Sequence, residues 1–327
     1  MARVYYIPSI AVIYNDRVLP IILTLAAQGN PTTVVYLSGQ AYRCCQRPGY
    51  GAWLARWTTP RYVLTTDVPS FLGRVLARVR FLFLWAEFRV RRGYVAFFDT
   101  KGSSPYTKRL SALAARRGRS ILYTASSVDT WCGAVDWDAV CRDPAIAARL
   151  GKPRVTGERA PIVYNTGNAV LVYGAAPSRA RDVPHHLPHL TVPLPLLQPW
   201  WRAFCATNPP QLDPAVDATR EYVAVFITYF GNYIFREDSD LDVLVTEIVR
   251  SVRAVWPEVP IVVKPKVSVD RKRLTQLLAA IADPHLIVSD APVALLAPRA
   301  ICGITAGHTT GQFEFVAAND VPWIEHC

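Results

Sequence analysis

The sequence has little methionine and histidine, and it lacks the short motifs of several common enzyme classes. Its 327 residues include 1 Met and 6 His, and only six of the 36 basic residues are Lys. It contains no P-loop, no G-x-G-x-x-G loop and no G-x-S-x-G elbow, which argues against kinase, dehydrogenase and hydrolase chemistry. No run of 18 uncharged apolar residues occurs, and the N-terminus has no signal-peptide pattern, so we expect neither a membrane-spanning helix nor a leader.

Cysteine and histidine patterns give no sign of a disulfide framework or a metal site. The seven cysteines are odd in number and irregularly spaced, with no C-x-x-C pair, which favours a reducing cytoplasm. His185, His186 and His189 form an HHLPH cluster, but it lies among prolines without a neighbouring cysteine or paired carboxylates. We therefore predict no bound metal and no cofactor.

Charge is distributed unevenly along the chain. The net charge is +11, and residues 61–120 alone hold 13 basic and 3 acidic residues, whereas residues 211–327 carry a net charge of −5. The 61–120 region includes a candidate helix, Phe71–Arg89, that is both aromatic and basic. This composition predicts docking on an anionic membrane surface, at the inner face of a cytoplasmic membrane; the alternative is a core helix with a solvated arginine face. The apolar residues are too dense for a nucleic-acid-binding arm, and no nucleic-acid motif is present.

The order of apolar segments predicts an α/β protein with two Rossmann-like domains facing a central cleft. The first domain is expected over residues 1–173 and the second over 215–327, joined by a proline-rich linker at 174–214 that we expect to hold neither a helix nor a central strand. The strands predicted in the first domain are Val4–Ile7, Thr33–Leu37, Tyr62–Thr65, Val95–Asp99, Ser120–Thr124 and Ile162–Tyr164. Its predicted helices are Arg17–Gln28, Phe71–Arg89 and Pro105–Arg117.

The second domain alternates more regularly. Its predicted strands are Tyr222–Thr228, Ile261–Val263, Leu286–Ser289, Ile301–Thr305 and Val321–Ile324. Its predicted helices are Ser239–Val255, Asp270–Ile281, Pro292–Leu296 and Thr309–Ala318. The triplet Asp238-Ser239-Asp240 is interpreted as the start of a helix rather than a metal-binding D-x-D motif.

Two constellations in the second domain suit a phosphate-bearing ligand. Lys264-Pro265-Lys266 ends a buried strand, where two cations can neutralise phosphate; the alternative is a solvated turn. A later strand runs through Thr305 into small and hydroxyl residues that open a helix, so backbone N–H groups and the helix dipole favour an anion there. Glu314 then lies about one turn into the helix, within reach of a sugar hydroxyl, or acts as a capping-box partner. The candidate binding residues are Lys264, Lys266, Ser289, Thr305, Gly307, His308, Thr309, Thr310 and Glu314.

Together these motifs resemble the C-terminal domain of GT-B glycosyltransferase-like proteins of bacterial surface polysaccharide synthesis, including capsule-synthesis proteins and CDP-glycerol glycerophosphotransferases. Lys264-Pro265 matches the family's K-P-H-P motif, with Lys266 in place of histidine. Thr309, Thr310 and Glu314 match S-T-x-x-x-E, and Asn319–Ile324 matches G-x-P-x-I. The opening segment is similar to GT-B N-terminal domains.

The resemblance implies a metal-independent glycosyltransferase. The second domain would hold a nucleotide-activated sugar or polyol phosphate, and the first would bind a surface-polysaccharide or lipid-linked acceptor. A base is needed near the acceptor hydroxyl, and Asp99, Asp16 and Asp67 are the candidates, with Asp99 the best placed. The alternatives are a hydrolysing nucleotide-sugar 2-epimerase and a catalytically silent membrane-surface protein on the same scaffold.

Overall fold

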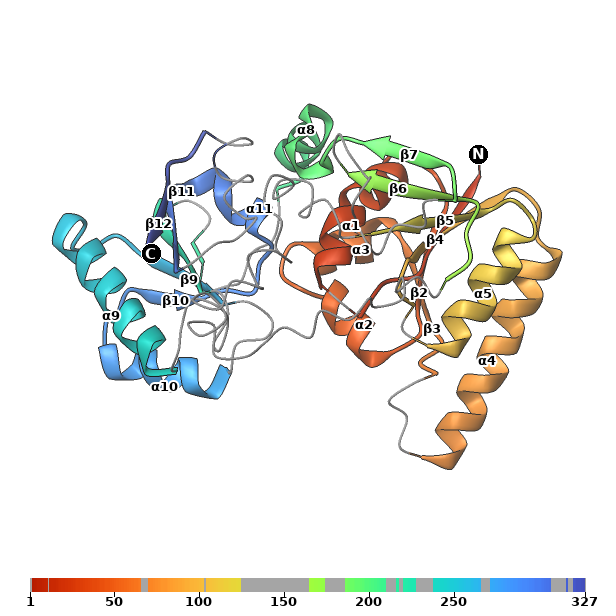
Figure 1. Cartoon of the computed structure of the whole chain (residues 1–327), viewed down its shortest axis with the longest axis horizontal. Helices are drawn as coiled ribbons and strands as arrows, with labels where there is room; N and C mark the ends of the chain where they lie inside the picture. Colours follow the sequence, from red (N-terminus) through yellow and green to blue (C-terminus); the bar gives the residue numbers. More distant parts are fainter. Residues whose placement is uncertain are drawn as a thin grey trace, which may run out of the picture. The chain divides into compact units, whose positions relative to one another are not determined.

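The computed structural model divides into two units, Met1–Ala134 with Gly157–Pro210, and Val135–Thr156 with Gln211–Cys327. Figure 1 draws both units. The structure describes residues 2–10, 12–65, 70–102, 104–124, 165–173, 186–209, 216–217, 220–227, 238–265, 271–306, 316 and 320–326.

The first unit is built on a seven-stranded, all-parallel sheet with the order β3-β2-β1-β4-β5-β6-β7. The strands are β1 (Arg3–Tyr6), β2 (Thr32–Tyr36), β3 (Thr59–Tyr62), β4 (Tyr94–Asp99), β5 (Ser120–Tyr123), β6 (Ala169–Tyr173) and β7 (His189–Val192). The helices are α1 (Val12–Ala27), α2 (Gly39–Cys45), α3 (Tyr50–Trp57), α4 (Phe71–Val90), α5 (Pro105–Ala115) and α8 (Pro199–Thr207), with a short 3-10 turn at Pro195–Leu197. Strand order and parallel pairing confirm the predicted Rossmann-like organisation.

Serine caps begin three of these helices. Ser38, Ser70 and Ser104 have extended backbones, and each hydroxyl accepts a hydrogen bond from an N–H in the first turn of α2, α4 or α5. Helices α4 and α5 then cover one face of the sheet, where Phe81 packs against Tyr106 with ring centroids 4.7 Å apart (Figure 1). Helix α8 packs against α3 through aromatic contacts between their side chains.

The second unit carries a five-stranded parallel sheet in the order β10-β9-β8-β11-β12. Its strands are β8 (Tyr222–Ile227), β9 (Ile261–Pro265), β10 (Leu286–Val288), β11 (Ala300–Ala306) and β12 (Trp323–His326), and its helices are α9 (Asp238–Val255), α10 (Arg271–Ile281) and α11 (Val293–Leu296), with a 3-10 turn at Ala297–Arg299. One face packs on α9 and α10, and the other packs on the segment around α11. Five predicted strands are confirmed here, each displaced by no more than a few residues.

Several predictions for the first unit were wrong. The segment predicted as a linker contains β7 and α8. Helix α8 can form there because Pro199 occupies its first turn, where the missing N–H is not needed. Strand β7 can form because it lies at the edge of the sheet, where proline is tolerated nearby. Helix α1 begins at Val12, five residues before the predicted start, with Pro20 inside it. Strand β3 lies three residues earlier than predicted, since this mostly exposed edge strand has no buried pattern to locate it. Strand β6 and helices α2 and α3 were missed.

The predicted strand Ile162–Tyr164 lies outside the described residues, as does the helix Thr309–Ala318 except for Val316. Cys44, Cys45, Cys205 and Cys302, the cysteines in the described part of the chain, form no disulfide. No helix among the described residues is long and apolar enough to cross a membrane.

Candidate functional site

The first sheet reverses its winding between β1 and β4. Helix α1 follows β1 on one face, and α5 follows β4 on the other face, so the two connections diverge from neighbouring strands. In open parallel sheets, ligands bind beyond the carboxyl ends of the strands at such a switch point. Ser9 follows β1 there, and Asp99 ends β4 beside its register partner Tyr123 on β5. This edge is the first candidate site.

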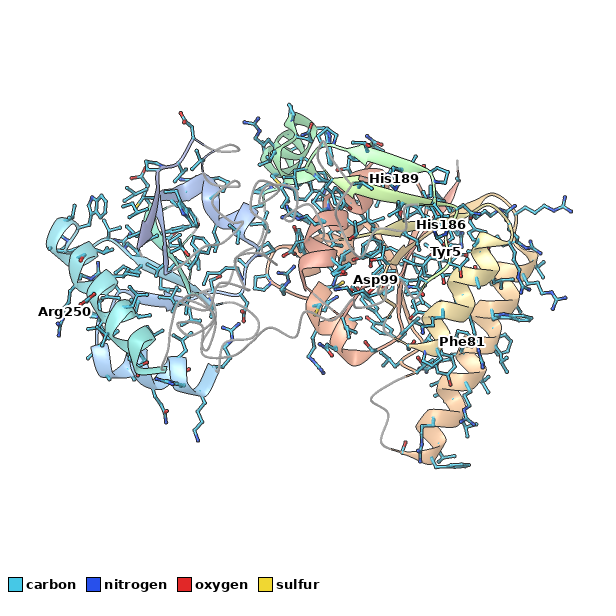
Figure 2. The ribbon with its side chains drawn as sticks, in the orientation of Figure 1. Tyr5, Phe81, Asp99, His186, His189 and Arg250 are labelled. Atoms are coloured by element: carbon cyan, nitrogen blue, oxygen red, sulfur yellow. The ribbon has the colours of Figure 1, made fainter. Side chains whose placement is uncertain are left out.

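Asp99 is held in a nearly closed environment, with 3% of its surface exposed. Its carboxylate accepts hydrogen bonds from the Gly102 N–H at 2.9 Å and from Asn165 Nδ2 at 3.3 Å. Burial raises the pKa of Asp99, and the Ser9 hydroxyl, the Gly102 N–H and the charge of Lys101 oppose that rise. The carboxyl group is therefore a stronger proton acceptor than a solvated aspartate. Figure 2 labels it within the first unit.

Gly102 and Asn165 fit closely around Asp99. Gly102 has φ of +67°, and a Cβ atom at this position would lie 2.9 Å from Asn165 Oδ1 and 3.0 Å from Nδ2. Asn165 Nδ2 also donates to the backbone oxygen of Asp99 at 2.6 Å, while its Oδ1 accepts from the Ser111 hydroxyl at 3.2 Å. The conformation of the turn after β4 therefore depends on Gly102, on the Asn165 amide and on the Asp99 carboxylate.

Next to it, Asn15 fixes the loop after β1. Its Oδ1 accepts from the Ser9 N–H at 2.9 Å and from the Tyr6 hydroxyl at 2.7 Å, and its Nδ2 donates to the Ser9 carbonyl at 2.9 Å. The Tyr123 hydroxyl donates to the Ile7 carbonyl at 2.8 Å. These buried bonds make the switch point rigid, which favours a preorganised site.

The other two predicted carboxylates have different surroundings. Asp16, on α1, forms an ion pair with Arg47, in which both terminal nitrogens of the guanidinium group contact the carboxylate. The Asp16 side chain is 25% exposed. Asp67 lies outside the described residues. Of the three candidate bases, the described chain therefore places Asp99 at the switch point and Asp16 in an ion pair.

A buried cation at the same edge was missed by sequence reasoning. Arg17, in the second turn of α1, is 5% exposed, and among the described residues its Nε has no hydrogen-bond partner. Its charge acts on Tyr173, the last residue of β6, where it opposes the rise in pKa that burial causes. The Tyr173 hydroxyl likewise has no partner among the described residues. Desolvated guanidinium groups require an anion or a strong acceptor nearby, so this pair suits an anionic ligand group.

The second sheet has its switch point between β8 and β11. Lys264 on β9 is the register partner of Phe226 on β8, and Phe226 is the partner of Thr305 on β11. Register partners on parallel strands project to the same face, so Lys264 and Thr305 flank Phe226 on the face that packs around α11. Ser289 follows β10 in the adjoining position, since its N–H donates to the Val263 carbonyl at 3.0 Å. The three described binding candidates thus share one row at the carboxyl edge.

Their accessibility differs. Thr305 is 0% exposed, and Ser289 is 1% exposed with its hydroxyl accepting from the Ala291 N–H at 3.1 Å, an arrangement that shapes the turn. Lys264 is half-buried and its Nζ lies 3.5 Å from the Asp290 carbonyl. Among these three, Lys264 is the side chain that can meet a ligand directly. Lys266, Gly307, His308, Thr309, Thr310 and Glu314 lie outside the described residues.

Two hollows of the second unit lie away from this edge. A cavity of about 140 Å³ is lined by Tyr222, Pro260 and Ile287 at the amino ends of the strands. A more open groove of about 420 Å³ runs between α9 and α10 and includes Arg250, which Figure 2 labels. His186 and His189 lie in the first unit, and no group of three metal-ligating side chains occurs within the described ranges.

No family model matches the sequence, and no curated protein matches it. Solved structures with low sequence identity are similar over nearly the whole chain. The glycotransferase of kitacinnamycin is 18% identical, with 98% of this chain and 79% of that chain covered and a TM-score of 0.48. The glycosyltransferase SsfS6 of Streptomyces sp. SF2575 is 12% identical over 99% and 81%, with a TM-score of 0.45. The UDP-GlcNAc 2-epimerase of Methanocaldococcus jannaschii, in complex with UDP-GlcNAc and UDP, is 12% identical over 99% and 83%, with a TM-score of 0.45.

Proposed function

We propose that this protein is a GT-B-type glycosyltransferase that moves a sugar, or a polyol phosphate, from a nucleotide-activated donor to an acceptor glycan. The observation that carries the proposal is the row at the carboxyl edge of the second sheet. It sets a cation, Lys264, beside the switch point between β8 and β11. Parallel sheets with this strand order bind nucleotides at that edge.

In the proposed reaction, the second unit stabilises the leaving nucleotide. The acceptor oxygen attacks the transferred group, the bond from that group to the donor phosphate breaks, and the electron pair stays on the phosphate oxygen. Lys264 would neutralise that developing charge, assisted by the N–H groups and hydroxyls that follow β11 in the sequence. Lys264, Lys266 and the Gly307–Glu314 stretch are the proposed donor-binding residues, with Ser289 and Thr305 shaping the turns between them.

The first unit would bind the acceptor, a surface polysaccharide or a lipid-linked glycan. Asp99 is the proposed base, because burial raises its pKa and leaves it a stronger proton acceptor than a solvated aspartate. Arg17 and Tyr173 would hold an anionic group of the acceptor, such as a phosphate. Asn15, Gly102 and Asn165 would act as positioning residues for the loops around Asp99.

Donor binding can be tested by thermal shift with UDP-, CDP-, GDP- and CMP-linked ligands. We expect one nucleotide class to stabilise the wild type and to lose most of that effect in Lys264→Met. Lys272→Met, which removes an exposed lysine from α10, is the matched control and should keep the shift. A wild type that no nucleotide stabilises would contradict the proposal.

Product analysis separates transfer from the 2-epimerase alternative. A transferase should release its nucleotide at a rate that rises with an added glycan acceptor, and should yield a lengthened glycan. A hydrolysing epimerase should release the nucleotide and a free epimerised sugar in water alone. Nucleotide binding without either product would support the catalytically silent alternative.

A further inference from the structure

Helix α4 has two apolar faces, of which only one packs against the protein. Ala77, Phe81, Leu84 and Phe88 are buried against the sheet and α5. A second set of large apolar side chains in the same helix is exposed: Phe71 at 71%, Leu72 at 78%, Val75 at 41%, Leu76 at 48%, Val79 at 41%, Leu82 at 61%, Phe83 at 67% and Val90 at 77%. We call this second set the outer face of α4.

The outer face is continuous and lies opposite the buried one. At about 100° of rotation per residue, the buried residues fall within an arc of roughly 60°, and the outer-face residues fall within an arc of roughly 140° centred on the other side of the helix. Arginines occupy the borders between the two faces. Arg74, Arg78 and Arg89 lie along one border and Arg80 along the other, and all four are exposed.

A water-facing apolar surface of this length is not expected on a globular unit. Isolated exposed apolar residues are common, but a contiguous apolar strip rimmed by charge marks an interaction surface. The N-terminal end of α4 extends beyond α5 in Figure 1. No residue of the first two turns, Phe71–Leu76, is buried, so these turns make little contribution to the core.

We propose that α4 lies flat in the headgroup region of an anionic lipid bilayer, with its outer face among the acyl chains and its bordering arginines on the lipid phosphates. Apolar residues on one face with arginines at the margins are the pattern of a helix that lies in a membrane interface. The arginines within α4 prevent it from spanning the bilayer. The proposal is independent of the transfer reaction and stands if the chain proves to be catalytically silent.

Charge selects the bilayer over a second copy of this chain as the occupant. Two α4 helices packed through their outer faces would bring the bordering arginines together. The acidic residue of α4, Glu87, already contacts Arg61 and Arg91 in its own chain. A self-associated pair would therefore place like charges along both margins, whereas anionic headgroups neutralise them.

Vesicle sedimentation tests the proposal. The protein should bind vesicles of phosphatidylcholine containing roughly a third phosphatidylglycerol and bind weakly to phosphatidylcholine alone, with affinity falling as salt rises. Leu72→Ser with Phe83→Ser should lower the affinity at least about tenfold. The matched control, Val243→Ser with Val255→Ser, removes two similarly exposed residues from α9 and should leave vesicle binding within about twofold.

A charge variant separates the two components of binding. Arg74→Gln with Arg78→Gln should lower the affinity for anionic vesicles about thirtyfold and flatten the salt dependence. Circular dichroism checks that each variant is folded. Binding that ignores phosphatidylglycerol content, or that survives both outer-face substitutions, would overturn the proposal. So would a lipid-free dimer in analytical ultracentrifugation that Leu72→Ser with Phe83→Ser converts to monomer.

Discussion

Substituting Gly102 by alanine should destabilise the first unit more than a turn glycine usually does. The residue has φ of +67°, and its added Cβ would lie 2.9, 3.0 and 3.1 Å from Oδ1, Nδ2 and Cγ of Asn165. Asn165 is 5% exposed and cannot move away without leaving its hydrogen bonds to Asp99 and Ser111. The substitution therefore combines backbone strain with a broken hydrogen-bond cluster.

The two contributions can be estimated separately. Alanine in the left-handed backbone region costs about 1–2 kcal/mol. Losing the bonds that Asn165 makes with Asp99 and Ser111 costs about 2–3 kcal/mol, because buried polar groups are left unpaired. Gly102→Ala should thus lower the free energy of unfolding by about 4 kcal/mol. Gly118→Ala is the matched control, since Gly118 has φ of +68° and an added Cβ there would meet no atom within 4 Å, so it should cost only the backbone strain.

A double-mutant cycle identifies the source of the cost. The three atoms nearest to the new Cβ all belong to the Asn165 side chain, so Asn165→Ala removes these contacts as well as the bonds. In that background, Gly102→Ala should cost only the backbone strain, and the coupling between the two substitutions should be about 2–3 kcal/mol. Urea unfolding followed by tryptophan fluorescence measures all four variants.

Additive costs would show that Asn165 is not the source of the extra cost at Gly102. If the two substitutions add to within about 0.5 kcal/mol, Asn165 does not limit the space around Gly102. If Gly102→Ala costs no more than Gly118→Ala, the amide moves freely, and the tight arrangement around Asp99 is not what fixes this turn.

Three further predictions concern charged groups. Asp99→Asn should become more stable relative to the wild type as the pH rises, because the raised pKa of Asp99 in the folded protein makes the wild type lose stability as the carboxyl ionises. Urea unfolding from about pH 4 to about pH 8 measures this difference in stability. A difference that does not change with pH would contradict the prediction. The same variant should lose transferase activity. Arg17→Met should leave the melting temperature unchanged or higher, since it removes a buried guanidinium whose Nε has no hydrogen-bond partner among the described residues. The same variant should bind an anionic acceptor more weakly in calorimetry, and a large loss of stability would indicate a structural role instead. Asp283→Asn should lower the melting temperature at neutral pH, because hydrogen bonding to Arg253 lowers the pKa of Asp283. The stability that the ionised Asp283 contributes is present above the ordinary pKa of aspartate and is lost as the pH falls through the lowered value. The difference in melting temperature between the variant and the wild type should therefore vanish in acid.

Much of the fold could be predicted because burial leaves a clear pattern in parallel sheets. Strands β8 and β9 are continuous apolar runs with buried residues throughout most of their length, and the sequence locates them within two residues. The pattern fails where burial is incomplete. Strand β3 is largely exposed, and α2 and α3 are only 7 and 8 residues long, so neither gives a periodic signal. Proline is misleading at α8, because a first-turn proline favours a helix that an internal proline would break.

The candidate site was predictable only in part. Position at a strand end suffices to select Asp99 and Lys264, because the carboxyl edge of a parallel sheet collects such residues. It does not reveal how exposed each side chain is, and Thr305 and Ser289, which share the row with Lys264, are buried. Arg17 could not be found at all, since an arginine on a helix is usually solvated. Only the fold shows that this one lies buried beside Tyr173.

The two units differ in how they present apolar surface, and the difference bears on where each one works. Among the described residues of the second unit, the exposed large apolar side chains are scattered over several elements: Val243, Val255, Val288, Val316 and Ile324. In the first unit, eight lie on one helix, within the region that carries the excess of positive charge. Scattered exposure is ordinary for a water-facing surface, whereas concentration on one basic helix marks an interaction surface. A helix that were simply buried would have no reason to place arginines at both margins of its outer face. Contact of that face with lipid would account for the position of the arginines, because each would then lie at the depth of the lipid phosphates.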